Sequence, residues 1–390
     1  MQTMKNKGSG YFCVLPILVG LLAYLPQRAV AYPVFARKYH LPCARCHSMV
    51  PRLTPFGYAF YRAGFRLPIN PPKSYTLTNM ITFMSEVDAT HSRETNSTTI
   101  PYENIELATA VESHWALRAE YSMSNVADTS SGFGEVWTQY NTSPKGTAWS
   151  LRVGQFPILD GYQLLGARSI TLTDPTLFGA FGPLSGAGQG NLSLEDLERG
   201  IEAGYSSNNF FARFSWLNGI DSAGDSPLAN SRLRDVVFQV ERIFPETGSS
   251  IGGFYYLGKT SFLGFNNHFQ RAGLFVTYAR ILEPGDAGIP RYRVELNGGL
   301  LWGRDRISSS ASANSFGSIL EADLYSHNRT AYAIRYDTAQ PSDAPGTPTT
   351  DALTFAIGHL ISNGARLGLE YRHQYNPNDD AWSASIWLLY

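Results

Sequence analysis

The chain has 390 residues, which is enough for one large domain or two smaller ones. Its formal net charge of -1, with no basic tract, gives no reason to expect a nucleic-acid partner. With 22 Tyr, 22 Phe and 36 Gly but only 16% charged residues, the composition favours an all-β chain with many short strands and turns.

Residues 1–31 are predicted to be a signal peptide. Lys5 and Lys7 form a positive n-region, residues 11–25 are an apolar run of the length of an h-region, and residues 29–31 are small. A membrane anchor would need an apolar stretch of about 20 residues, and prolines and a glycine interrupt this one. The chain is therefore expected to be exported, and the mature protein to begin at Tyr32.

The mature chain keeps two cysteines, because Cys13 leaves with the predicted signal peptide. Cys43 and Cys46 are followed at once by His47, and C-x-x-C-H is the attachment motif of c-type haem. In this motif the two thiols add to the two vinyl groups of the porphyrin, and the adjacent imidazole reaches the iron as its proximal ligand. A redox-active disulfide usually occurs near a βαβ pattern, which the sequence lacks, and it would not require the histidine. We therefore predict one covalent haem c, bound through Cys43, Cys46 and His47.

Two stretches flank this motif. They are residues 33–39, Pro-Val-Phe-Ala-Arg-Lys-Tyr, and residues 51–57, Pro-Arg-Leu-Thr-Pro-Phe-Gly, which Phe60, Gly64 and Phe65 follow. Together with the haem motif they resemble the N-terminus of fused cytochrome–porin proteins of bacterial outer membranes, closely over residues 33–67 and beyond them only in architecture. The best-known members are iron oxidases, and the same N-terminal pattern occurs in barrel proteins of unassigned role. The resemblance implies an outer-membrane protein that passes single electrons between an external donor such as Fe(II) and periplasmic c-type cytochromes.

Residues 32–73 are predicted to form the haem-bearing segment, which is helical or irregular. One helix is expected from Pro55 to Ala63, and Gly64 ends it. A segment of about 40 residues rarely sustains a core by itself. We therefore expect it to be a plug held by a wall that residues 74–390 form.

The remainder of the chain falls into strand-like segments of alternating character. In residues 75–87 the odd positions are mostly apolar and the even positions mostly polar. The same alternation occurs in residues 210–216, 236–241, 292–296, 320–324 and 366–371. A soluble β-sandwich would bury its apolar faces and would not line a shared second face with so many charges. The pattern predicts strands with one face toward lipid and the other toward a lumen.

The links between these strands alternate between short and long. The short links are predicted at residues 114, 142–146, 206–208, 244–249, 283–290, 326–328 and 362–364, and the long ones at residues 88–103, 124–133, 156–197, 218–234, 259–267, 304–315, 338–350 and 376–379. This alternation is typical of an outer-membrane barrel and predicts about 16 antiparallel strands, with both termini on the periplasmic side. A barrel of that size encloses an aqueous channel. The longest link, residues 156–197, is expected either to fold into the lumen or to lie outside as a surface flap.

Three residues are candidates for the sixth ligand of the haem iron. Met80 and Met84 occupy even positions of the first strand, so they should face the lumen, and a thioether is a usual distal ligand that raises the potential. His40 lies beside the motif in the sequence, although only three residues separate it from Cys43. The alternative role for each methionine is that of a packing residue that faces the lumen.

Two functions of different classes follow from these predictions. The first is an electron conduit in the outer membrane, which is an enzyme only if an external reductant is its substrate. The second is a porin in which the haem segment gates or senses and the lumen passes a small solute. A soluble periplasmic haem-binding β protein is a third and weaker alternative. The sequence has no G-x-S-x-G, H-E-x-x-H or phosphate-binding loop, so the chemistry is expected to belong to the cofactor.

Overall fold

The structure is a computed structural model, and the residues that it describes lie within Tyr32–Tyr390. The described residues are 34–67, 80–93, 96–111, 114–123, 132–143, 148–159, 170–185, 188–189, 196–207, 209–219, 233–262, 265–283, 291–307, 312–326, 329–341, 349–376 and 378–389. The predicted signal peptide, residues 1–31, lies outside them. No described helix has both the length and the apolar character that a membrane-spanning helix requires.

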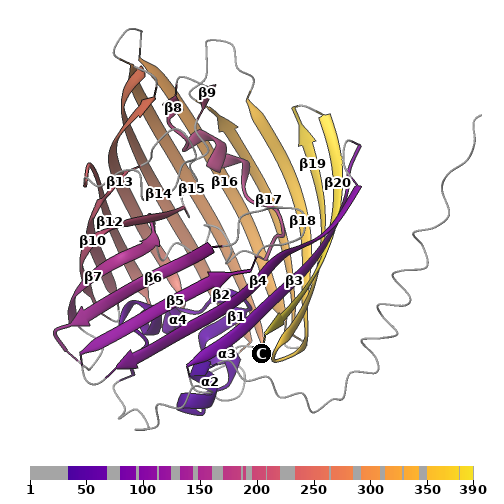
Figure 1. The fold of residues 1–390 in the computed structure, drawn as a ribbon. Helices are drawn as coiled ribbons and strands as arrows, with labels where there is room; N and C mark the ends of the chain where they lie inside the picture. The colour runs from indigo at the N-terminus through magenta and orange to yellow at the C-terminus, as the bar shows by residue number, and fades with distance from the viewer. Residues whose placement is uncertain are drawn as a thin grey trace, which may run out of the picture. The chain divides into compact units, whose positions relative to one another are not determined.

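The predicted barrel is present, and it is closed by 16 antiparallel strands (Figure 1). They are β3 (Ile81–His91), β4 (Asn96–Val111), β5 (Trp115–Ser122), β6 (Gly132–Asn141), β7 (Ala148–Pro157), β10 (Leu197–Ser206), β11 (Phe210–Leu217), β12 (Asp235–Phe244), β13 (Ser249–Phe262), β14 (Phe265–Glu283), β15 (Tyr292–Ile307), β16 (Ala313–Ser326), β17 (Thr330–Gln340), β18 (Thr350–Ser362), β19 (Ala365–Tyr375) and β20 (Asn378–Leu389). Each strand pairs with the next along the chain, β7 pairs with β10, and β20 pairs with β3 to close the ring.

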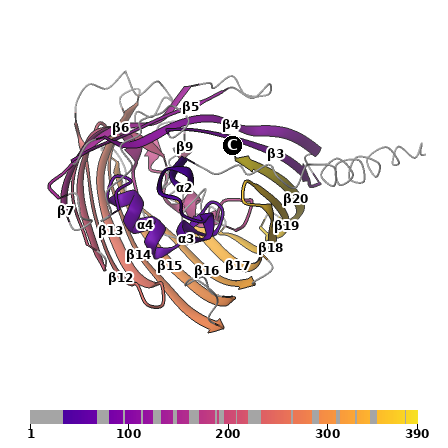
Figure 2. The ribbon, with the colours of Figure 1, turned by 90° about the horizontal axis from the view of Figure 1, so that it is seen from below.

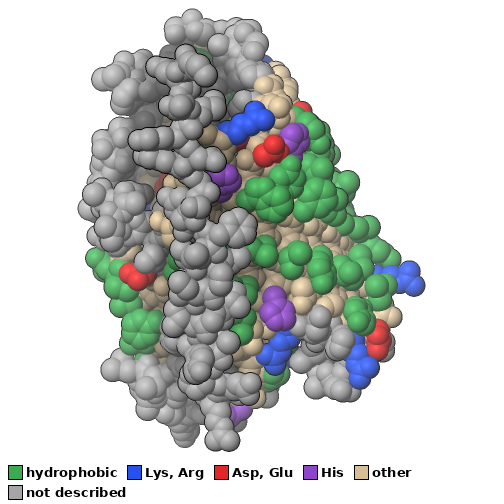
Figure 3. All heavy atoms as spheres, turned by 90° about the vertical axis from the view of Figure 1, so that its right-hand side faces the viewer, with side chains coloured by type: hydrophobic (Ala, Val, Ile, Leu, Met, Phe, Trp, Pro, Cys, Tyr) green, Lys and Arg blue, Asp and Glu red, His purple; other side chains and the backbone are tan. Residues whose placement is uncertain are grey.

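The alternation of side chains along the strands is also confirmed. In β11, Phe214 and Trp216 are 49% and 48% exposed on the outward face, whereas Arg213 points inward and is buried. The same alternation places Leu320 outside and Glu321 inside on β16. Figure 3 shows hydrophobic side chains over much of the described part of one outer face, with most charged side chains toward its upper and lower edges.

Several links predicted to be long are shorter in the structure. β3 continues to His91 and β4 begins at Asn96, and these two residues pair in register, although residues 88–103 were expected to be a loop. Similarly, β13 ends at Phe262 and β14 begins at Phe265. The prediction was wrong because polar residues were taken to end a strand. A hairpin that extends beyond the apolar layer meets water on both faces, so its pairing continues without alternating hydrophobicity.

The N-terminal segment lies inside the ring of strands at one end of the barrel (Figure 2). Its elements are α2 (Val34–Tyr39), α3 (Cys43–Cys46), β1 (His47–Met49), β2 (Arg52–Leu53) and α4 (Pro55–Arg62). The predicted helix is confirmed as α4, and Gly64, with φ of +65°, follows its end. An aromatic cluster joins the segment to the wall, since Phe65 stacks on Phe35 at 4.6 Å and on Trp137 of β6 at 5.6 Å.

The described residues of the link between β7 and β10 lie in the lumen, which is one of the two alternatives predicted for this link. It contains η4 (Thr176–Ala180), β8 (Leu184–Ser185) and β9 (Gly188–Gln189). Carboxylates of the wall accept hydrogen bonds from its backbone: Glu370 accepts from the Leu172 amide at 2.6 Å, and Asp305 accepts from the Leu184 amide at 3.1 Å. Residues 170–184 are therefore held against the inner face of β15 and β19, and we refer to them as the inner loop.

Candidate functional site

The two cysteines of the C-x-x-C-H motif occupy one helical turn. Pro42 precedes α3, and its carbonyl accepts a hydrogen bond from the Arg45 amide at 2.9 Å. Residues three apart on a helix lie on the same face, so Cys43 and Cys46 point to the same side of the turn. Both cysteines are free thiols and half-buried. This spacing suits attachment at two points along one edge of a flat ring.

His47 leaves the helical turn in an extended conformation and begins β1. Its Nδ1 lies 3.1 Å from the carbonyl oxygen of Pro51. Because a carbonyl only accepts, Nδ1 is the donor, and Nε2 keeps the lone pair that a metal needs. A metal-binding histidine usually donates its other ring N–H to a carbonyl or carboxylate in this way. The residues present therefore fit a haem iron ligated by His47.

The stretch that follows the motif holds the turn in place. The Thr54 amide donates to the Cys46 carbonyl at 2.8 Å, and the Thr54 hydroxyl donates to the Arg45 carbonyl at 2.8 Å. The same hydroxyl accepts from the Gly57 amide at 3.1 Å, which caps α4. A Cβ on Gly57 would lie 2.2 Å from the Cys46 carbonyl oxygen, so this position requires glycine. The sequence indicated residues 51–57 only through their resemblance to cytochrome–porin proteins. The structure gives a physical role to these residues, which hold the turn of the C-x-x-C-H motif in place.

Burial also sets the protonation of the two thiols. Burial and, to a smaller extent, the neighbouring Cys43 together raise the pKa of Cys46 to about 11, against the lowering effect of Arg45. Burial likewise raises the pKa of Cys43. Near neutral pH both groups are therefore thiols in this structure. Redox-active C-x-x-C motifs differ in having a lowered thiol pKa.

Of the three candidates for the sixth ligand, one lies within β3 and the other two lie directly beside β3 and α2. Met84 is half-buried in β3, and the buried Thr82 and exposed Phe83 beside it confirm that even positions face the lumen. Met80 directly precedes β3 and is half-buried, while His40 follows α2 and is exposed. The part of the first strand before residue 80 lies outside the described residues. The identity of the sixth ligand stays a prediction.

A buried arginine fixes the motif to the barrel wall. Arg52 Nη2 lies 2.7 Å from Glu295 Oε2 and 3.2 Å from Asp323 Oδ2, and its Nη1 lies 3.4 Å from Glu321 Oε1. The arginine is 0% exposed, and the three carboxylates come from β15 and β16. Charge-assisted hydrogen bonds of this kind are strong where water is excluded. The segment is thus bound to the wall five residues after His47 in the chain.

Further contacts place the N-terminal segment at the end of the barrel that carries the links predicted to be short. Arg66 donates to carbonyls of Val111 and Trp115 beside the β4–β5 link. Gly248, in the β12–β13 link, is so close that an added Cβ would lie 3.1 Å from Pro55. The last strand ends there as well, because the Leu389 amide donates to the carbonyl of Gly364 in the β18–β19 link.

The inner loop and the N-terminal segment meet at one side chain of β19. Arg366 donates through Nη1 to the Val50 carbonyl at 3.0 Å and through Nη2 to the Ile170 carbonyl. Farther along the loop, Arg271 of β14 donates through Nε to the Phe181 carbonyl at 2.7 Å and pairs with Asp305 at 3.0 Å. The inward-facing side chains of Arg366 and Arg271 are buried against these segments. The inner loop and the N-terminal segment therefore narrow the lumen, which was predicted to be an aqueous channel.

No protein-family model matches the chain, and no curated protein sequence matches it. Among solved structures, it is similar to an anion-selective porin from Comamonas acidovorans, with a TM-score of 0.59 and 12% identity over 80% of this chain and 98% of that chain. It is also similar to OmpT, an outer membrane protein of Vibrio cholerae (TM-score 0.54, 10% identity, 80% and 96% of the two chains). The outer membrane channel DcaP of Acinetobacter baumannii is comparable (TM-score 0.53, 9% identity, 80% and 96%). At such identities the likeness shows the fold, a barrel of the outer-membrane porin type.

Proposed function

We propose that this chain is an outer-membrane barrel whose N-terminal segment carries one haem c and passes single electrons between an external donor and periplasmic c-type cytochromes. The observation that carries the proposal is the C-x-x-C-H turn, in which Cys43 and Cys46 share one side and Nδ1 of His47 is bonded to the Pro51 carbonyl, as in metal-binding histidines. Cys43 and Cys46 would bind the haem covalently, and the haem would supply one-electron exchange. Fe(II) is one candidate donor, through the resemblance alone.

The outer membrane is proposed from the wall of the barrel. Large apolar side chains lie outward around it, including Leu320 at 64%, Trp149 at 63% and Trp382 at 61% exposure. A water-soluble surface rarely carries so much apolar area, whereas lipid is a suitable solvent for it. The porin-type fold supports the same location.

The position of the motif supports electron transfer in particular. Arg52 and its three carboxylates hold the haem-bearing turn inside the mouth of the barrel rather than on a free domain. A membrane insulates a periplasmic cytochrome from an external donor, and a cofactor set into a barrel shortens the distance between them. The two termini would then lie at the periplasmic end, where the short links are.

A second candidate function is a porin that passes a small solute, with the haem segment as gate or sensor. The likeness to solved porins supports this candidate more directly than it supports electron transfer. The buried contacts of the inner loop and the N-terminal segment in the lumen favour the conduit. Under the porin function, the N-terminal segment has to move or leave a path beside it.

Covalent attachment is tested first. Denatured protein should keep a haem-peroxidase signal on a gel, and Cys46→Ala should greatly reduce that signal. Full covalent haem in a protein with both Cys43→Ala and Cys46→Ala would overturn the proposal.

The two functions are then separated by two measurements on the same purified holoprotein. Mixing the ferric protein with Fe(II) and other reductants should shift the haem absorption bands to the ferrous form, and planar bilayers should show little conductance. A large steady conductance with a haem that no external reductant reaches would support the porin instead.

A further inference from the structure

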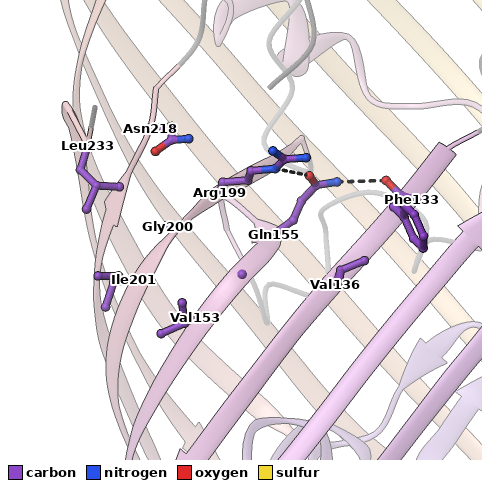
Figure 4. Close-up of a pocket in the computed structure, with 10 residues that line it drawn as sticks. Phe133, Val136, Val153, Gln155, Arg199, Gly200, Ile201, Asn218 and Leu233 are labelled. Atoms are coloured by element: carbon purple, nitrogen blue, oxygen red, sulfur yellow. Dashed lines mark hydrogen bonds between the residues drawn. The ribbon is translucent and has the colours of Figure 1, made fainter. Parts of the chain in front are cut away.

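An open groove of about 500 Å³ lies on the outward face of the wall, over the neighbouring strands β6, β7 and β10 (Figure 4). It is far from the haem motif in the chain and belongs to none of the contacts described above. The residues that line it are Phe133, Val136, Val153, Gly154, Gln155, Arg199, Gly200, Ile201, Asn218 and Leu233.

Two glycines form the floor of the groove. Gly154 of β7 and Gly200 of β10 pair directly across the two strands. A Cβ on Gly154 would lie 2.2 Å from the Val136 carbonyl oxygen, and Gly154 has a φ of +140°, so both space and backbone require glycine there. Val153 and Ile201, 45% and 41% exposed on the outward face, pair with each other directly across the two strands, at the next position along from the glycines. The result is a shallow slot over the glycine backbone that ends on this apolar pair.

One end of the slot is polar. Arg199 donates through Nε to Gln155 Oε1 at 3.1 Å, and Gln155 donates in turn to the Phe133 carbonyl at 3.0 Å (Figure 4). Gln155 also donates to the Gly134 carbonyl at 2.8 Å. Within the described part of the chain, Gln155 is the only hydrogen-bond partner of this guanidinium. The bond orients the Arg199 side chain through Nε and leaves its two terminal nitrogens available to a ligand. These two nitrogens are the pair with which arginine binds phosphate in a bidentate manner.

The placement of Arg199 on the wall identifies the surroundings of the groove. Ile201, two residues along, is exposed on the outward face, whereas Glu202 is buried in the lumen, so Arg199 shares the outward face. β10 begins at Leu197, which places Arg199 near the end of the wall opposite the haem motif. A charge on the lipid-facing side of a barrel is costly at the midplane and tolerated at the interface. The polar end is therefore at headgroup level and the glycine floor is deeper.

We infer that the groove binds a phosphate-bearing membrane lipid, with its phosphate on the terminal nitrogens of Arg199 and one acyl chain running over the glycine pair and against Val153 and Ile201. The order of charge, then apolar slot, matches the order of headgroup and chain in a lipid. A free phosphate ion would leave the apolar slot unused. This inference rests on the membrane location in the proposed function and not on the haem.

The test measures lipid binding to the detergent-purified holoprotein by native mass spectrometry, with phosphatidylglycerol as the probe. Diacylglycerol, which lacks the phosphate, and inorganic phosphate, which lacks the chain, are the comparison ligands. Arg199→Gln should weaken phosphatidylglycerol binding about tenfold, since a charge-assisted pair is lost. Arg306→Gln is the matched control, because Arg306 is also exposed near the same end of the wall, on β15, and should leave binding unchanged.

A second pair of variants tests the slot. Val153→Trp should fill it and weaken lipid binding, whereas Leu300→Trp, at an exposed outward position of β15, should not. Equal binding of diacylglycerol and phosphatidylglycerol, or full displacement of the lipid by inorganic phosphate, would overturn the inference. So would a change of oligomeric state in Val153→Trp with unchanged lipid binding, which would make the groove an interface between copies. The covalent haem signal of each variant is read separately, so a failure of the haem proposal is distinguishable.

Discussion

Gly57 is a single residue on which the geometry of the haem motif depends. Its lack of a side chain lets α4 approach the Cys46 carbonyl, to which Thr54 also donates. The sequence predicted the motif and the helix because both are local patterns, read from adjacent residues. The close approach could not be predicted, since it depends on how α4 folds back over α3.

Gly57→Ala should therefore reduce covalent haem while leaving the barrel folded. The added methyl group has to displace the backbone of Cys46, which costs on the order of 1–3 kcal/mol and shifts the thiols. The quantity measured is the haem-peroxidase signal on a denaturing gel, divided by the amount of folded barrel in the same preparation. Gly298→Ala is the control, because a Cβ there meets nothing within 4 Å. Equal haem content in both variants would contradict the role of Gly57.

Arg52 shows a different limit of sequence reasoning. Strand parity places Glu295, Glu321 and Asp323 toward the lumen, and that part was predictable from β15 and β16 alone. Their partner was not, because Arg52 lies 243 residues before Glu295 in the chain. Nothing local to either residue indicates the pairing.

Arg52→Gln should loosen the N-terminal segment, because it removes a cation that three buried carboxylates share, although Glu295 also pairs with Arg293 at 2.6 Å. Breaking a buried charge pair from one side typically costs about 3–5 kcal/mol. Limited proteolysis of the folded protein should then cleave residues 34–67 faster than in the unmodified chain. Glu321→Gln, which removes only the 3.4 Å contact, should have a smaller effect. A segment as resistant as before in Arg52→Gln would show that Arg52 is not the anchor.

At the scale of elements, the period of two along each strand was the most reliable prediction. It located the inward and outward faces of β3, β11 and β16 correctly, because the pleat fixes the direction of each side chain. The ends of the strands were predicted less well. β3 extends to His91 because cross-strand pairing with β4 continues beyond the apolar layer.

The parity of β3 also leads to a prediction about the sixth ligand. If Met80 or Met84 binds the iron, replacing it by Ala removes a soft donor that favours the ferrous state, so the reduction potential should fall. A sulfur-to-iron charge-transfer band should disappear from the ferric spectrum as well. Phe83→Ala, on the outward face, is the control and should leave the spectrum unchanged. A spectrum altered only by His40→Ala would instead indicate bis-histidine ligation.

At the scale of the whole molecule, the end of the last strand, the N-terminal segment of residues 34–67 and the predicted short links share one end of the barrel. This arrangement predicts which side is reachable in cells. A tag inserted within residues 342–348 should be labelled on intact cells, whereas a tag within residues 144–147 should be labelled only after the outer membrane is opened. The opposite pattern would reverse the orientation of the barrel, and labelling of both tags would place the protein elsewhere.

The closure of β20 onto β3 sets an order for biogenesis. The ring is sealed by its first and last strands, and the segment inside it directly precedes the first. Under the proposed function, haem has to be attached to Cys43 and Cys46 from the periplasm, and both thiols are half-buried when the segment lies in the barrel. We therefore expect maturation to precede insertion. Pulse-labelled chains stalled before insertion should already contain haem, and apo-barrels should not acquire it when haem supply is restored late.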